Sequence, residues 1–425
     1  MPHPAAPSAP VSERLHGLDA LRGFALLLGV ALHAAMAWMP GAQYFWITHD
    51  ADPSEALSGL FWWIHSFRMT TFFLLAGFFA RLLCERVGPR AFALDRWRRV
   101  GRPLLALWPM LFTGIVIAVV WGAWLKGGGS LPAESPPGPK FTPDDFPLTH
   151  LWFLYVVSLF YIVTLALRTM ILQLDPCGLL STACDALFDR LMGPWAPLLL
   201  AVPVAVALMT QVDWYAWFGV PTPDQSLYPN LSAVIGFGTA FAVGWWLQRK
   251  RPLLDRIATG VWLNLGLALI TSVLCLSIVG IAPPLAPATQ DATTLLYAWS
   301  YGVAGWSWTL ALTGLALRYC SDHSALRRYL ADASYWVYLV HLPVVMALQV
   351  AATQFEGPWW VEFPSVLMLG LALIFGNYHG MVRNTALGAW LNGQKRVADN
   401  AVYRTPMSAA SLQAPHAEAT NRLGV

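Results

Sequence analysis

The chain has 425 residues, of which 57% are hydrophobic and 12% are charged. Soluble domains carry about 25% charged residues, so this composition excludes a soluble globular enzyme, a disordered chain and a nucleic-acid-binding protein. The formal net charge of +3 is small, and the distribution of the charges is more informative than their sum. We therefore expect an α-helical protein that crosses a lipid bilayer several times.

Apolar runs close to the ~20 residues that a bilayer requires recur along the whole chain. They predict ten spans, at residues 18–39, 57–82, 103–125, 148–172, 194–210, 229–247, 257–282, 292–317, 333–353 and 361–382. The predicted fold is therefore all-α, a polytopic membrane helical bundle of about ten transmembrane helices.

The basic residues indicate how these spans are oriented. With a cytoplasmic N-terminus, nearly all Lys and Arg fall on the cytoplasmic side, and the predicted outer loops carry only Lys126 and Lys140. The positive-inside rule then favours an even number of spans with both termini in the cytoplasm. We expect a cytoplasmic N-terminal segment at 1–17, a membrane domain at 18–382 and a largely disordered cytoplasmic tail at 383–425.

The first span carries an aligned pair of polar residues. Arg22 and His33 are separated by eleven steps of about 100°, which end about 20° beyond three full turns. Both side chains therefore lie on one stripe, about 16 Å apart along the helix. Asp19 can pair with Arg22 from one turn away, and Gly29 leaves room beside His33. The alternative is that Arg22 reaches the membrane interface and His33 only packs.

The second span places His65 and Arg68 on one helix face, three residues apart. Charge inside a membrane is costly and marks a functional position by default. The alternative is that both residues pair with an acidic side chain elsewhere in the bundle.

Two later spans carry further polar side chains. His150 and Trp152 open the fourth span at its outer face, where His150 is a candidate for binding the acceptor. The alternative is that Trp152 anchors an interfacial aromatic belt and His150 is a solvent-exposed interfacial residue. Ser334, Tyr338 and His341 form one stripe of the ninth span, which the predicted boundaries place in the inner half of the membrane. This stripe either lines an entrance or is a hydrogen-bonded seam between helices.

A dense basic stretch at 96–102 precedes the third span. Arg98, Arg99 and Arg102 are candidates for binding phosphate groups through their guanidinium forks. The alternative is that the stretch contacts anionic lipid.

Together these strings resemble acyltransferase family 3, the integral-membrane acyltransferases, over residues 14–382. The resemblance rests on the string at 18–23 followed by His33, the basic stretch ending at Pro103, the string at 150–154, and the series Ser334, Tyr338, His341. Within the family, the strings at 65–69 and 338–341 are most similar to the glucan biosynthesis protein C branch, which succinylates periplasmic glucans.

The resemblance implies a multi-pass enzyme of the cell inner membrane. It implies transfer of an acyl group, succinyl or acetyl, from cytosolic acyl-CoA to a hydroxyl of an extracytoplasmic glucan or other polysaccharide. His33 would be the general base or a transient acyl carrier, because an imidazole ordinarily titrates near pH 6.5. Arg68, Tyr338 or His65 would stabilise the oxyanion. We expect the lipid bilayer, acyl-CoA and the acceptor as partners. We expect no permanently bound cofactor, no metal and no nucleic acid.

Two other functions fit the composition. A polysaccharide or small-molecule transporter or flippase would also need many spans with charges inside the membrane, but we find no matched halves of the kind that transporters show. A structural membrane subunit would leave Arg22, Arg68 and the histidines unexplained. The sequence does not determine the oligomeric state.

Overall fold

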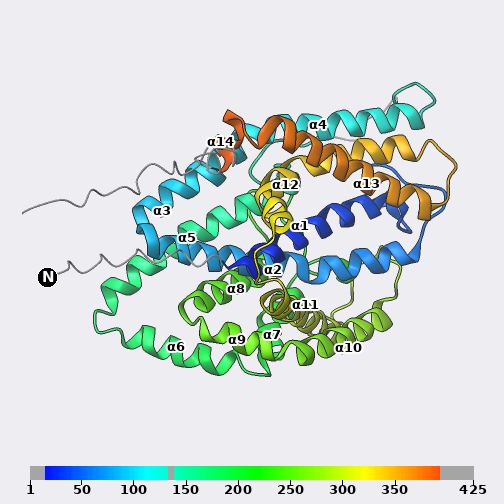
Figure 1. Ribbon diagram of the computed structural model, residues 1–425. Coiled ribbons are helices and arrows are strands. Elements are labelled where there is room, and N and C mark those ends of the chain that lie inside the picture. Colours follow the sequence, from blue (N-terminus) through cyan, green and yellow to red (C-terminus); the bar gives the residue numbers. More distant parts are fainter. Residues whose placement is uncertain (1–14, 133–137, 393–425) are drawn as a thin grey trace, which may run out of the picture.

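The computed structural model describes residues 15–132 and 138–392, and these residues form a bundle of fourteen α-helices joined by loops and short turns (Figure 1). The helices are α1 (His16–Ala35), α2 (Glu55–Val87), α3 (Pro89–Arg96), α4 (Arg102–Lys126), α5 (Trp152–Leu174), α6 (Leu179–Leu191), α7 (Ala196–Met209), α8 (Leu231–Arg249), α9 (Pro252–Thr259), α10 (Val261–Val279), α11 (Ala292–Tyr319), α12 (Ala325–Ala352), α13 (Trp359–Asn377) and α14 (Ala386–Asn392). The short turns are η1 (Met36–Trp38), η2 (Ala42–Tyr44), η3 (Trp97–Gly101), η4 (Thr149–Leu151), η5 (Ala216–Phe218) and η6 (Tyr378–Val382). The all-α prediction is confirmed for this part of the chain.

Side-chain caps fix where several long helices begin. The side-chain oxygens of Asn230, Asp291 and Ser324 accept hydrogen bonds from backbone amides in the first turns of α8, α11 and α12. Such caps satisfy amides that have no partner within the helix. The cap at Ser324 matters for the site, because α12 begins at Ala325, two turns before the span predicted at 333–353.

Eight helical stretches of the described residues are long and apolar enough to cross a membrane, and a ninth is added if the bent pair α6 and α7 is one span. The two remaining predicted spans correspond to α7 and α11. The structure thus confirms a multi-pass helical protein with about eight such helices, and the total of ten crossings stays a prediction.

The helix α11 explains why hydropathy alone is a poor guide inside a bundle. It is 28 residues long, but it carries Ser300, Ser307, Thr309 and Thr313, all fully buried. Helices α2, α7, α9 and α10 pack around it. Because these neighbours separate it from lipid, its composition does not need to be apolar throughout.

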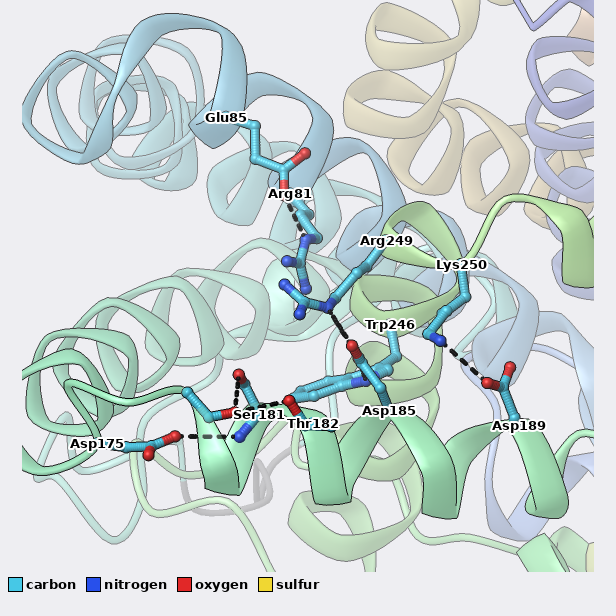
Figure 2. Close-up of polar contacts among 11 residues, drawn as sticks. Arg81, Glu85, Asp175, Ser181, Thr182, Asp185, Asp189, Trp246, Arg249 and Lys250 are labelled. Atoms are coloured by element: carbon cyan, nitrogen blue, oxygen red, sulfur yellow. Dashed lines mark hydrogen bonds and ion pairs between the residues drawn. The ribbon is translucent and has the colours of Figure 1, made fainter.

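The bend between α6 and α7 is 107°, and α6 is held to the end of α8 by ion pairs (Figure 2). The Asp185 carboxylate accepts hydrogen bonds from Arg249 Nε at 2.8 Å and Trp246 Nε1 at 3.0 Å. Lys250 Nζ lies 2.9 Å from Asp189 Oδ2. These contacts hold α6 against the end of α8, and Gly193 and Pro194 interrupt the helix before α7. The span predicted at 194–210 therefore contains only the 14 residues of α7.

The long helices run between two ends of the bundle (Figure 1). The start of α1 and the last described helix, α14, belong to the same end, because Arg22 of α1 contacts Ala331 near the start of α12, while α14 packs against η3 and η6. The start of the predicted tail at 383–425 is too early, because residues 386–392 form α14 and Leu391 is buried in the core. Residues 1–14 and 393–425 of the predicted terminal segments lie outside the described residues.

The helices α2 and α8 make the most extensive contact in the bundle, and glycines permit it. A Cβ atom on Gly244 would lie 1.8 Å from the carbonyl oxygen of Leu74, and one on Gly77 would lie 2.0 Å from that of Phe241. Both obstructing atoms belong to helix backbones, which cannot move aside independently.

We expect Gly244→Ala to destabilise the protein by about 1–3 kcal/mol or more, because the two helices must separate to admit the methyl group. The measurement is thermal unfolding in detergent. Gly266→Ala in α10 is the matched control, since a Cβ there has no neighbour within 4 Å. Equal melting temperatures for the two variants would contradict this packing.

Candidate functional site

A cavity of about 1340 Å³ extends through the bundle between α1, α2, α5 and α12. Its lining follows α2 from Phe61 to Arg86, about 37 Å of helix. We call one end the arginine end, which is lined by Arg22, Arg86, Arg96, Arg99 and Arg383. We call the other the loop end, which is lined by Phe45, Trp46, Phe218, Thr222, Asp224 and Gln225.

The stripe predicted on the first helix is present in α1, because Arg22 and His33 both line this cavity. Arg22 Nη2 lies 3.3 Å from Asp19 Oδ1, as the spacing predicts, and donates to the carbonyl oxygen of Ala331 at 3.2 Å. These two contacts hold the guanidinium at the arginine end. His33 lies about 16 Å further along the helix.

His33 is held on two sides. Its ring stacks on that of Trp46, with centroids 6.0 Å apart and an 18° angle between the planes. The fully buried amide of Gln349 accepts from Trp46 Nε1 at 2.9 Å and donates to the carbonyl oxygens of His33 and Ala34, both at 2.9 Å. Gln349 therefore fixes both members of the stack, although nothing in its sequence context indicates this role.

Arg68 occupies the space that Gly29 leaves open. A Cβ atom on Gly29 would lie 2.2 Å from Arg68 Nη1, so the guanidinium rests against α1 one turn before His33. No acidic side chain in the described part of the chain lies within ion-pairing distance of Arg68, which removes the pairing alternative there. His65 stacks on Phe61, with centroids 5.3 Å apart, and also lines the cavity.

Two further imidazoles converge on His33 from α12 and η4. The ring of His341 lies 5.3 Å from that of His33 and 5.3 Å from that of His150. His341 Nδ1 donates to the carbonyl oxygen of Tyr338 at 2.7 Å, and His150 Nε2 donates to that of Leu339 at 2.8 Å. A carbonyl oxygen only accepts, so in the neutral rings His341 Nε2 and His150 Nδ1 carry the lone pairs.

The stripe of α12 is predicted in the inner half of the membrane, but His341 does not lie further inward than His33. The early start of α12 places His341 about 24 Å along that helix, while His33 lies about 26 Å along α1, which begins at the same end. The two rings are therefore at one level of the bundle. The hydroxyl of Tyr338 donates to the carbonyl oxygen of His150 at 2.5 Å, so its proton is engaged. His150 is buried, which excludes the alternative of a solvent-exposed interfacial residue.

Ser334 and Trp152 line the cavity but have internal partners. Ser334 Oγ donates to the carbonyl oxygen of Ala331 at 2.7 Å, the same oxygen that Arg22 contacts. Trp152 packs against Phe237 and Phe73, with ring centroids 5.5 and 6.2 Å away. Both residues shape the wall of the cavity.

The arginine end differs from the basic site that the sequence predicts. Arg99 lines the cavity, with Nε 2.8 Å from Asp95 Oδ1, whereas Arg98 and Arg102 are exposed and do not line it. Arg98 and Arg102 lie four residues apart on the exposed side of η3 and the start of α4. Arg86 and Arg383 line the cavity but are absent from the predicted site, although each lies just beyond an apolar span.

The loop end consists of segments that connect the predicted spans. Residues 143–149 pair with residues 224–227 through backbone hydrogen bonds, including Phe146 N to Gln225 O at 3.0 Å and Thr149 N to Asp224 O at 3.1 Å. Thr149 has a φ of 52°, a strained conformation for a β-branched residue, directly before His150. Within residues 15–132 and 138–392, no three His, Cys, Asp or Glu side chains are grouped as metal ligands.

Comparison with known proteins gives one family and several relatives. A family model described as "Acyltransferase domain", that of acyltransferase family 3, matches residues 15–378. Three relatives are each 32% identical to this chain over 151 residues. They are proteins named Glucans biosynthesis protein C, from Escherichia coli strains SMS-3-5 / SECEC, O1:K1 / APEC and O157:H7 EC4115 / EHEC. The aligned region covers 34% of this chain and 37% of each relative. No solved structure matches the chain.

Proposed function

Because this chain belongs to acyltransferase family 3 and carries its acyltransferase domain, we propose that it is a membrane O-acyltransferase. It takes an acyl group, succinyl or acetyl, from cytosolic acyl-CoA and places it on a hydroxyl of an extracytoplasmic glucan or other polysaccharide. The arginine end faces the cytosol, both termini are cytoplasmic, and the membrane is the cell inner membrane. The names of the relatives support a glucan acceptor.

The proposal is carried by one observation, a single cavity with three distinct parts. Five guanidinium groups line its arginine end, His33 and Arg68 lie in its interior, and its loop end carries uncharged side chains and Asp224. Arginine forks bind phosphate groups, and coenzyme A is rich in phosphates. Its pantetheine arm has a length comparable to the separation of about 16 Å between Arg22 and His33. The thioester can therefore reach the imidazole while the phosphates stay at the arginine end.

The chemistry follows from these positions. His33 removes the proton of the acceptor hydroxyl, whose oxygen attacks the thioester carbonyl. The guanidinium of Arg68 lies one turn away and stabilises the oxyanion, a role for which the Tyr338 hydroxyl, bound to the His150 carbonyl oxygen, is less available. The C–S bond then breaks, and the coenzyme A thiolate takes the proton from the imidazolium. In a second route, His33 attacks the thioester first and carries the acyl group transiently.

The decisive experiment uses purified protein, acyl-CoA labelled in the succinyl or acetyl group, and a glucan acceptor, without any gradient. Label that becomes covalently attached to the glucan supports acyl transfer. The cavity reaches both ends of the helices, which also suits a transporter or flippase. Movement of intact glucan into sealed vesicles, with no label transferred, would favour that alternative and overturn the proposal.

The arginine end gives a separate prediction. We expect Arg99→Gln to raise the KM for acyl-CoA about tenfold, because a hydrogen bond to a charged group is worth about 1.5–3 kcal/mol. The adjacent substitution Arg98→Gln removes the same charge outside the cavity and serves as the control. Equal effects of the two substitutions in steady-state kinetics would show that the basic stretch acts through lipid rather than through the donor.

A further inference from the structure

We infer that the loop end of the cavity is a carbohydrate subsite, in which Asp224 and Gln225 bind sugar hydroxyls and Phe45, Trp46 and Phe218 cover the sugar rings. This inference rests on the proposed transfer to a glucan and names the part of the cavity that receives it. Neither the family match nor the relatives assign a site to these residues.

The subsite is built by three loops that lie far apart in the sequence. Phe45 and Trp46 belong to the loop between α1 and α2, and Asp224 and Gln225 to the loop between η5 and α8. The latter loop is held by backbone hydrogen bonds to residues 143–149, among them Leu227 N to Pro143 O at 2.8 Å. Because the main chain makes these contacts, the side chains are free to face the cavity.

Asp224 has the acceptor capacity that a sugar requires. Its carboxylate receives two long hydrogen bonds, from Thr222 Oγ1 at 3.3 Å and from Gln225 Nε2 at 3.3 Å. A carboxylate offers about four acceptor positions, so capacity for hydroxyl donors is left. No Lys, Arg or His of the described chain forms an ion pair with it. Burial raises the pKa of this carboxyl above its ordinary value, so a donor that hydrogen-bonds to the ionised form lowers the cost of its charge.

Aromatic rings line the path from Asp224 to His33. The rings of Phe45 and Phe218 lie 5.5 Å apart, and Phe218 lies 6.1 Å from Phe61. Trp46 stacks directly on His33. Rigid aromatic surfaces with a few polar groups beside them are a common way to bind ring-shaped ligands. A sugar seated against Phe45 and Trp46 would have a hydroxyl close to the imidazole.

Charge separates the two substrates within one cavity. The arginine end attracts phosphates, whereas Asp224 at the loop end repels anions and accepts from neutral hydroxyls. The cavity thus favours an anionic donor at one end and a neutral, hydroxyl-rich acceptor at the other. This arrangement assigns the loop end to the sugar rather than to any part of coenzyme A.

The test compares Asp224→Asn with Asp213→Asn, and Phe218→Leu with Tyr215→Leu. Asp213 and Tyr215 are exposed at the same end of the bundle and do not line the cavity, so they are matched controls. The first readout is equilibrium binding of a labelled glucan oligosaccharide to the purified protein without donor. We expect a Kd about tenfold higher for Asp224→Asn and Phe218→Leu, and unchanged for the controls.

The second readout separates this inference from the proposed function. During transfer, Asp224→Asn is expected to raise the KM for the glucan about tenfold and to leave the KM for acyl-CoA unchanged. Wild-type protein that binds glucan but transfers no label would overturn the proposed function, and a Kd raised only in Asp224→Asn and Phe218→Leu would then still support the subsite. Transfer with an unaltered glucan Kd and KM in Asp224→Asn and Phe218→Leu would overturn the subsite, as would wild-type protein that binds no glucan.

Discussion

Substitution of His33 by alanine is expected to lower kcat for acyl transfer by about 10²–10⁴-fold, the contribution that a positioned general base usually makes. The KM for acyl-CoA should change little, because the arginine end remains intact. The measurement is the steady-state rate of label transfer by detergent-purified protein. A second variant, His33→Gln, retains much of the side-chain volume and is expected to lose as much activity.

A histidine in the loop between α1 and α2 provides the control. His49 is exposed and does not line the cavity, so His49→Ala should retain wild-type kcat. Melting temperatures of all three variants distinguish a chemical role from a folding defect. Normal folding together with near wild-type kcat in His33→Ala would remove His33 from the mechanism.

The second large effect is expected at Arg68. Arg68→Met removes the guanidinium in the cavity and should lower kcat by about 10²–10³-fold, as the loss of an oxyanion donor does. Its stability should be unchanged or higher, because the removed charge has no acidic partner in the described residues and its burial is costly. A structural role for Arg68 predicts the opposite, a clear loss of melting temperature.

A glycine substitution tests the same role without removing the charge. In Gly29→Ala the new methyl group meets the end of the Arg68 side chain, which is flexible and can move aside. We therefore expect nearly normal stability and a fall in kcat that approaches that of Arg68→Met. Gly23→Ala, on the same helix, meets its nearest neighbour at an ordinary 3.6 Å and should be close to wild type. Full activity in Gly29→Ala would contradict the position assigned to the guanidinium.

Much of the fold is predictable from the sequence because a bilayer requires long apolar runs. Prediction fails where helices are screened from lipid or extend beyond it. The buried hydroxyls of α11 lower its hydropathy although it is central to the bundle. Gly193 and Pro194 mark the bend before α7, whereas the direction of α6 depends on ion pairs with the end of α8 that no local pattern encodes. The polar first turns of α12 hide its true start at Ala325.

The same limits apply to the site. Helical periodicity correctly aligns Arg22 with His33, because that relation is local to one helix. The placement of His341 beside His33 depends on where α12 begins and could not follow from the span boundaries. The choice of Arg99 over Arg98 depends on which side of η3 packs toward the cavity, a tertiary relation. Asp224 and Gln225 lie in a loop that is placed by pairing with residues 143–149, a nonlocal contact without a sequence signature.

The most direct measurement is an experimental structure of the protein with a non-hydrolysable thioether analogue of acyl-CoA. We predict that its phosphates lie within hydrogen-bond distance of Arg99 and Arg383, and that its acyl carbonyl lies between His33 and Arg68. An analogue bound outside the cavity, or one whose acyl group points away from His33, would contradict the proposed route of the donor.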